Sequence, residues 1–379
     1  MTLAAALDSR RILLCVGSGG VGKTTTAAAL GIAAARRGRR VAVLTVDPAR
    51  RLKDALGLHT LDGQPRRVRL DQPDPGGGRL DALLLDVKRT FDELVLGLAS
   101  TPEQAHRVLD NRLYQNLSTT LPGTAEYMAV ETLCRLAEAG THDLLVVDTP
   151  PAQHAVDFLD APRRLLALLD SRAFAIMRDP TSILPAAGSR LAHLVLSAVV
   201  HGLERFTGIG LVREIGEFVQ AIEALTEALR LRVAQVAALL RSEATSLLLV
   251  AAPEPRLIAE TEVFTRALRG IGLGIDGVIV NRTLPRGIFG IAAGEPPPLP
   301  GLAPALTARL RRSFADVRTL AACQEATLAP LLRTAAAPVL AEVPLLPAAP
   351  GSVADLVALG QYLLPAAADG GAPAEEPGR

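Results

Sequence analysis

The stretch Ile12-Leu13-Leu14-Cys15-Val16-Gly17-Ser18-Gly19-Gly20-Val21-Gly22-Lys23-Thr24-Thr25-Thr26 decides the fold of this chain. Apolar residues give way to glycines, and an alanine-rich segment follows. The stretch fits the pattern G-x-x-x-x-G-K-[ST], in which backbone N–H groups converge on a phosphate at the start of a helix. It therefore predicts a phosphate-binding loop between a strand over residues 10–16 and a helix over 23–37. A chance glycine-rich turn is the alternative, but phosphate binding requires this strand-loop-helix context.

Lysine is rare in this chain. Only Lys23, Lys53 and Lys88 are lysines among its 40 basic residues. A lysine inside the loop suits a phosphate because its ammonium is a compact point charge, whereas arginine presents a planar fork. We expect Lys23 to reach the outer phosphates of a nucleotide and the Thr24 hydroxyl to ligate magnesium.

Composition favours a globular protein in a reducing compartment. The 379 residues are 49% hydrophobic but only 3% aromatic, so leucine, alanine and valine must build most of the core. A net charge of +1 gives no reason to expect nucleic acid or an anionic membrane as partner. Cys15, Cys134 and Cys323 lie far apart, which argues against a zinc site. Without a signal-like start or a membrane-length apolar run, we expect a cytoplasmic protein.

Strand-like apolar runs alternate with helical segments along the chain. After the first strand, such runs cover residues 41–46, 80–85, 144–147, 246–252, 278–281 and 339–343. The alternation predicts an α/β protein with the three-layer phosphate-loop NTPase fold and a parallel sheet. We expect a single domain over 10–365, with a helical insertion at about 161–241 and a disordered tail over 366–379. Residues 61–79, rich in proline, glycine and aspartate, are expected to form a surface loop.

Two carboxylates end neighbouring strands of the predicted sheet. Asp148 closes the apolar run over 144–147, and Asp47 follows the run over 41–46. The carboxyl ends of parallel strands meet at one edge of the sheet, where ligands of such folds bind. Phosphoryl transfer needs a carboxylate to hold magnesium or its waters and a group to orient the attacking water. Asp148 suits the first role and Asp47 the second, although both would also serve as caps after strands.

With these motifs in order, the chain resembles the ArsA family of deviant phosphate-loop ATPases. That family includes arsenite-pump ATPases and ATPases that target tail-anchored membrane proteins, and the chain is most similar to its single-copy bacterial branch. The resemblance covers residues 11 to about 364. It rests on the loop and on segments that follow it in family order: 47–52 (D-P-A-R-R-L), 121–126 (L-P-G-T-A-E), 148–154 (D-T-P-P-A-Q-H), 253–254 (P-E) and 280–281 (V-N).

The resemblance implies roles for individual residues. Asp47 and Lys23 would be catalytic, with Asp47 orienting the water, and Thr24 and Asp148 would hold magnesium. Asn281 would recognise adenine, and the backbone near 344–345 would close over the base. The nucleotide-binding set that follows from the resemblance is Gly17, Ser18, Gly19, Gly20, Val21, Gly22, Lys23, Thr24, Thr25, Glu254, Asn281, Pro344 and Leu345.

Ser18 departs from the family pattern. Deviant members usually have a lysine at this position that reaches the partner's phosphates across a dimer, and serine removes that charge. Hydrolysis must then be slow, or Arg50, Arg51 or a partner chain must supply the charge. The thiol cluster of arsenite sites and the C-x-x-C zinc site of targeting members are also missing from the sequence.

The resemblance implies magnesium-dependent ATP binding and hydrolysis, coupled to the conformation of a dimer and to partner or client binding. The dimer would be a homodimer, or a heterodimer with a lysine-bearing paralogous ATPase. The alternative is a nucleotide-binding regulatory or scaffold subunit that hydrolyses little ATP alone. An apolar stripe in the predicted insertion would either pack against the core or bind a hydrophobic client or membrane-protein partner; it comprises Leu191, Leu194, Val195, Ala198, Val199, Leu203 and Phe206.

Overall fold

The structure is a computed structural model that describes residues 2–47, 51–70, 77–111, 114–115, 124–171, 210–284 and 301–364. The chain divides into two compact units. The sheet unit combines Met1–Leu84, Ala139–Val156 and Glu243–Arg379, and the helical unit combines Leu85–Glu138 and Asp157–Ser242. The domain limits expected from the sequence stay a prediction.

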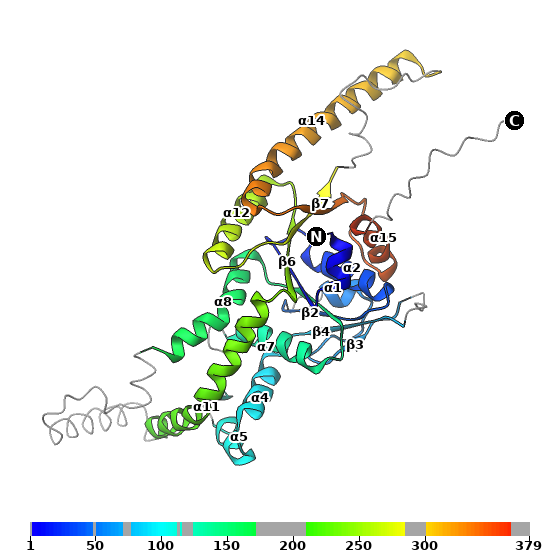
Figure 1. Ribbon diagram of the computed structural model, residues 1–379. Coiled ribbons are helices and arrows are strands. Elements are labelled where there is room, and N and C mark those ends of the chain that lie inside the picture. Colours follow the sequence, from blue (N-terminus) through cyan, green and yellow to red (C-terminus); the bar gives the residue numbers. More distant parts are fainter. Residues whose placement is uncertain are drawn as a thin grey trace, which may run out of the picture. The chain divides into compact units, whose positions relative to one another are not determined.

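An eight-stranded sheet forms the centre of the sheet unit (Figure 1). Its strand order is β3-β4-β2-β5-β1-β6-β7-β8, and all described pairs are parallel except β3 with β4. The strands are β1 (Ile12–Val16), β2 (Arg40–Thr45), β3 (Arg66–Arg67), β4 (Arg79–Leu84), β5 (Leu144–Asp148), β6 (Thr245–Ala251), β7 (Gly277–Thr283) and β8 (Val339–Pro344). Strands β1, β5 and β6 are buried throughout, as continuous apolar strands covered on both faces should be.

Helices cover the sheet on both sides (Figure 1). The helices of this unit are α1 (Leu3–Ser9), α2 (Lys23–Arg36), α3 (Arg51–Ala55), α12 (Pro255–Gly270), α14 (Pro304–Ala335) and α15 (Val353–Leu363). Alternate strand residues such as Leu13, Val43 and Val146 join the core that α1, α2 and α15 share, while α12 and α14 contact β6 and β7. The predicted three-layer α/β fold with a parallel sheet is confirmed.

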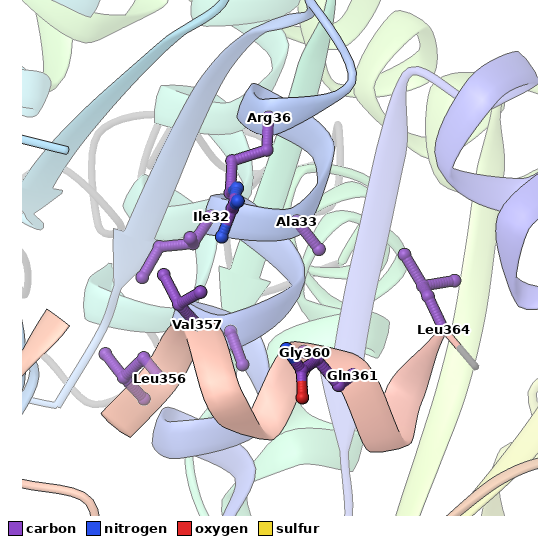
Figure 2. Close-up of a pocket in the computed structure, with 9 residues that line it drawn as sticks. Ile32, Ala33, Arg36, Leu356, Val357, Gly360, Gln361 and Leu364 are labelled. Carbon is purple, nitrogen blue, oxygen red and sulfur yellow. The ribbon is translucent and has the colours of Figure 1, made fainter. Parts of the chain in front are cut away.

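Helices α2 and α15 enclose a small pocket of about 200 Å³ (Figure 2). Its apolar wall includes Ile32, Leu356 and Val357, and Arg36 lies at its edge. The lining residues of α2 run from Ala29 to Arg36, near its C-terminal end, whereas the phosphate loop precedes its first residue. This pocket is therefore separate from the predicted nucleotide site.

The helical unit contains α4 (Val87–Leu98), α5 (Pro102–Leu109), most of α7 (Thr124–Ala139) and α8 (Ala152–Leu169), and α11 (Gly210–Arg241). Leu94, Tyr127 and Val233 form its apolar core. Beside them the buried Glu131 accepts hydrogen bonds from Arg232, which joins α7 to α11. Among the helices of the described ranges, none is long and apolar enough to cross a membrane.

The sequence-based element assignments need four additions. Residues 61–79 include the short strand β3, because two residues there pair with β4, so this segment is not loop throughout. Helices α1, α3 and α15 were not predicted, and the segment 303–334, expected to form one or two helices, forms one helix, α14. The apolar stripe over 191–206, the residues 121–123 and the tail over 366–379 lie outside the described residues.

Candidate functional site

The loop between β1 and α2 has the backbone that phosphate binding requires. Gly17 has φ of +149°, and a Cβ there would lie 2.2 Å from the carbonyl oxygen of Val250. Gly22 has φ of +98°, and its Cβ would lie 2.3 Å from the Asn281 amide nitrogen. Both positions therefore require glycine. Gly22 is also the N-cap residue of α2, and it has no side chain that could accept a hydrogen bond from the first N–H groups of this helix. Such N–H groups are the ones that bind phosphate at the start of a helix.

Lys23 lies inside this loop. Its side chain is 7% exposed, and the ammonium donates hydrogen bonds to the carbonyls of Gly17 at 3.0 Å and Ser18 at 2.9 Å. Burial lowers the pKa of Lys23, and the nearby negative charges of Asp148 and Asp47 act in the opposite direction. The loop thus holds a desolvated cation, which favours the arrival of an anion.

Asp148 connects the loop to two neighbouring strands. One carboxylate oxygen accepts hydrogen bonds from the hydroxyls of Thr24 at 2.7 Å and Thr45 at 3.1 Å. The strand register explains the contact, since Thr45 lies directly opposite Asp148 in the β2–β5 ladder. Burial raises the pKa of Asp148, while these two hydrogen bonds and the charge of Lys23 oppose the rise. The next residue, Thr149, donates its hydroxyl hydrogen to the carbonyl of Cys15 at 2.8 Å.

Asp47 lies two residues after β2 and is half-buried. Its negative charge raises the pKa of both Lys23 and Asp148, so all three groups share one electrostatic environment. Arg51, at the start of α3, acts on the same lysine and lowers its pKa. Residues 48–50 lie outside the described residues, so the structure does not place Arg50.

The Ser18 side chain contacts α12. It is fully buried, and its hydroxyl lies 2.8 Å from the Thr261 hydroxyl and donates to the Leu257 carbonyl at 3.2 Å. Only the main chain of Ser18 faces the Lys23 ammonium. The Ser18 hydroxyl thus anchors the phosphate loop to α12.

The residues expected to contact the base lie together at the carboxyl edge of the sheet. The Asn281 amide donates to the Val21 carbonyl in the loop at 2.8 Å. The Leu345 amide donates to the Thr283 carbonyl at 2.7 Å, which places 344–345 beside the end of β7. Glu254 is separate from the phosphate loop in its contacts: it is exposed at the start of α12 and pairs with Arg282 at 3.2 Å.

Comparison with known proteins agrees with this geometry. Residues 10–288, about three quarters of the chain, match the anion-transporting ATPase family, also called ArsA. The chain belongs to this family. The matched region includes the phosphate loop, Asp47, Asp148, Glu254 and Asn281. The resemblance recognised from the motifs is confirmed.

Individual ArsA-family relatives share about a quarter to a third of their aligned residues with this chain. An uncharacterised protein of Streptomyces coelicolor is 34% identical over 282 residues, which are 73% of this chain and 63% of that protein. A Mycobacterium tuberculosis protein is 31% identical over 235 residues, covering 54% of this chain and 55% of its own. The ATPase get3 of Neurospora crassa is 26% identical over 286 residues, which are 75% of this chain and 76% of that protein. The chain thus spans less than two thirds of the two bacterial relatives.

Three residues of the site were missed from the sequence. Thr45 contacts Asp148, and only its position at the end of the strand preceding Asp47 pointed to it. Thr261 contacts Ser18 from 243 positions away, which no local pattern reveals. Arg282 has φ of +59°, uncommon for a residue other than glycine, and lies at an irregularity in the β7–β8 ladder.

Proposed function

We propose that this chain binds and hydrolyses ATP with magnesium. The observation that carries the proposal is the convergence of Lys23, Thr24 and Asp148 at the start of α2. In a bound nucleotide the Lys23 ammonium would exchange its two carbonyl acceptors for phosphate oxygens, and the N–H groups of the loop would complete the cradle. Asp47, half-buried at the same edge, would orient the attacking water.

The donors at this point suit magnesium. Thr24 and Asp148 provide a hydroxyl and a carboxylate 2.7 Å apart, and Mg²⁺ prefers such oxygen ligands. Thr24 would ligate the ion and Asp148 would hold its waters, as in other phosphate-loop NTPases. When bound, the ion neutralises charge on the transferring phosphate. Thr45 donates a hydrogen bond to the same Asp148 oxygen at 3.1 Å and would keep this carboxylate in place.

Phosphate release by the purified chain tests the proposal. We expect magnesium-dependent turnover in the wild type and a loss of at least about 100-fold in Lys23→Ala and in Asp47→Asn. Lys53→Ala removes a lysine on α3 and should keep full activity. Equal phosphate release from all four proteins would contradict the proposal.

Ser18 supports a second candidate function. A serine carries no charge, and the Ser18 hydroxyl is already engaged by α12, so this residue supplies no cation to a phosphate. We propose as the alternative a nucleotide-binding regulatory or scaffold subunit. Such a subunit would bind ATP tightly with little turnover, and a lysine-bearing paralogue would restore turnover. Measuring ATP binding and phosphate release on the same preparation separates the two functions.

We further propose that the nucleotide state controls a dimer, either of two copies of this chain or with a paralogous ATPase, and through it the binding of a hydrophobic client. This proposal rests on membership of the ArsA family alone. Sedimentation velocity should show a larger species with ATP than with ADP for the wild type and no such change for Lys23→Ala. A monomer in both nucleotide states would contradict the homodimer.

A further inference from the structure

Helix α14 is largely uncovered by the rest of the sheet unit. Of its 32 residues, all described, only Leu331 and Ala335 near the C-terminal end are buried. That end packs against α12, whereas the earlier turns extend away from the sheet (Figure 1). The helix lies after residue 288, beyond the residues that match the ATPase family.

One face of the exposed turns is apolar. Leu306, Leu310, Phe314 and Val317 follow each other at intervals of four, four and three residues, so they form one stripe along the helix, called the α14 stripe. Leu306 is 43% and Leu310 41% exposed, and the other two are half-buried. The same periodicity continues to Leu331 and Ala335. The α14 stripe is therefore the continuation, along the exposed turns, of the helix face that packs against the sheet unit at the C-terminal end.

Arginines flank the α14 stripe. Arg309, Arg311, Arg312 and Arg318 are all exposed, and Asp316 is the one acidic residue between positions 304 and 322. At 100° per residue, Arg309 and Asp316 lie along one border of the stripe, and Arg311 and Arg318 lie along the other. The near-neutral net charge of the whole chain conceals this local excess of positive charge.

We propose that the exposed half of α14 binds the surface of an anionic membrane. Its apolar stripe would enter the boundary between headgroups and acyl chains, and the flanking arginines would reach the lipid phosphates along their alkyl stems. An apolar stripe with arginines on both borders, two of them on the border without an acidic residue, matches a flat anionic surface. A second copy of the helix is a poor occupant, because pairing two stripes would bring arginines against arginines.

Co-sedimentation with vesicles tests this inference, without nucleotide, so that its outcome is independent of the proposed ATPase activity. The full chain should bind vesicles of phosphatidylcholine with phosphatidylglycerol and bind pure phosphatidylcholine far less. Raising the salt from about 0.1 M to about 0.5 M should release it. Each arginine near an anionic surface contributes about fivefold in affinity, so Arg311→Gln with Arg318→Gln should weaken binding by about 25-fold.

Matched variants distinguish an effect of the α14 stripe from the effect of removing any exposed leucine or arginine. Leu306→Ser with Leu310→Ser should weaken vesicle binding by at least about tenfold. Leu168→Ser with Leu231→Ser removes two leucines of similar or greater exposure in the helical unit and should leave binding unchanged. Arg163→Gln with Arg333→Gln is the matched control for charge, since both arginines are exposed and lie off the stripe.

The cysteines allow a second readout that reports the orientation of α14. Cys15 and Cys134 are buried and Cys323 is exposed, so a thiol-reactive, polarity-sensitive dye should label Cys323 selectively. Ser313 lies on the stripe side, whereas Cys323 lies on the opposite side of the helix. A dye on Ser313→Cys, in a Cys323→Ser background, should shift to the blue with anionic vesicles, and a dye on Cys323 should not.

Three results would overturn the inference: equal binding to neutral and anionic vesicles, unchanged binding of both α14 double variants, or equal dye shifts at the two positions. Failure to bind any vesicle, together with binding of a synthetic acidic amphipathic peptide, would assign the surface to an acidic protein instead. A dimer of the wild type that the Leu306→Ser, Leu310→Ser variant dissociates would assign it to a second copy. Either result also overturns the membrane assignment.

Discussion

At the scale of single residues, Lys23 gives the site a measurable proton linkage. Burial lowers its pKa in the free protein, and the negative charge of a bound phosphate should raise that pKa toward the ordinary lysine value. ATP binding should therefore take up protons between the lowered and the ordinary pKa, and affinity should fall as the pH rises through this window. The free protein should become more stable over the same window, because the unfolded chain there binds more protons.

Calorimetry in buffers of different ionisation enthalpy, over a pH series that ends at the ordinary lysine pKa, measures this uptake. Lys23→Met keeps a side chain of similar length without the charge, and its residual ATP binding should show no proton uptake from this position. Uptake of the same size in wild type and variant would assign the linkage to another group.

Thr45 provides a second test at the residue scale. Thr45→Val keeps the shape of the side chain but deprives the buried Asp148 carboxylate of one of its two hydroxyl donors, and should lower the free energy of unfolding by about 1–2 kcal/mol. The pKa of Asp148, already raised by burial, should rise further. Stability should then fall more steeply than in the wild type as the pH rises from the ordinary aspartate pKa to the raised one.

Urea unfolding across pH measures both effects, and Thr45→Ser, which retains the hydroxyl, should stay close to the wild type. Identical stability of Thr45→Val and Thr45→Ser would mean that the hydrogen bond to Asp148 contributes nothing.

At the scale of elements, Ser18 couples the phosphate loop to α12. A double-mutant cycle of Ser18→Ala with Thr261→Val should give a coupling free energy of about 0.5–1.5 kcal/mol, because each change removes one side of the 2.8 Å contact. Thr265→Val is the matched control, since this buried hydroxyl one turn later donates to the Thr261 carbonyl instead. Equal coupling of Ser18 with both threonines would show that no specific hydroxyl contact joins loop and helix.

A buried ion pair joins two helices of the helical unit. Glu131 on α7 is 1% exposed and accepts three hydrogen bonds from the Arg232 guanidinium on α11, at 2.7, 2.9 and 3.0 Å. Glu131→Leu alone should cost about 3 kcal/mol of unfolding free energy, because it removes the buried carboxylate partner of a poorly solvated cation and leaves it with the more exposed Glu138. Adding Arg232→Met should recover most of that loss. Denaturant unfolding of the two single variants and the double variant measures this coupling. A loss of unfolding free energy in the double variant equal to the sum of the two single losses would contradict it.

Helices and strands could be predicted where a long sequence pattern marks them, and were missed where the pattern is short. Strand β1, the loop and α2 could be predicted because an apolar run, glycines and an alanine-rich helix follow one another. Helix α15 was missed, although Ser352 and Asp355 form a reciprocal capping box that marks its start. Strand β3 has two residues and depends on pairing with β4, so no periodicity could predict it.

At the scale of the whole molecule, the parallel sheet explains why distant residues could be expected at one edge. Asp47, Asp148 and Asn281 each lie near the carboxyl end of a strand, and parallel strands bring these ends together. Side-chain partners were not predictable in this way. Ser18 meets α12 only through packing, and the basic amphipathic character of α14 is hidden by a net charge of +1.

The most direct test of the account is ATP binding to the full chain with and without magnesium. Titration calorimetry should show that Mg²⁺ tightens ATP binding in the wild type, and that Lys23→Met weakens it by at least about tenfold. Thr24→Val should lose most of the magnesium effect while retaining metal-free binding, because the Thr24 hydroxyl lies between loop and carboxylate. Binding that is indifferent to magnesium, and equal in all three proteins, would contradict the assignment of this loop as the nucleotide site.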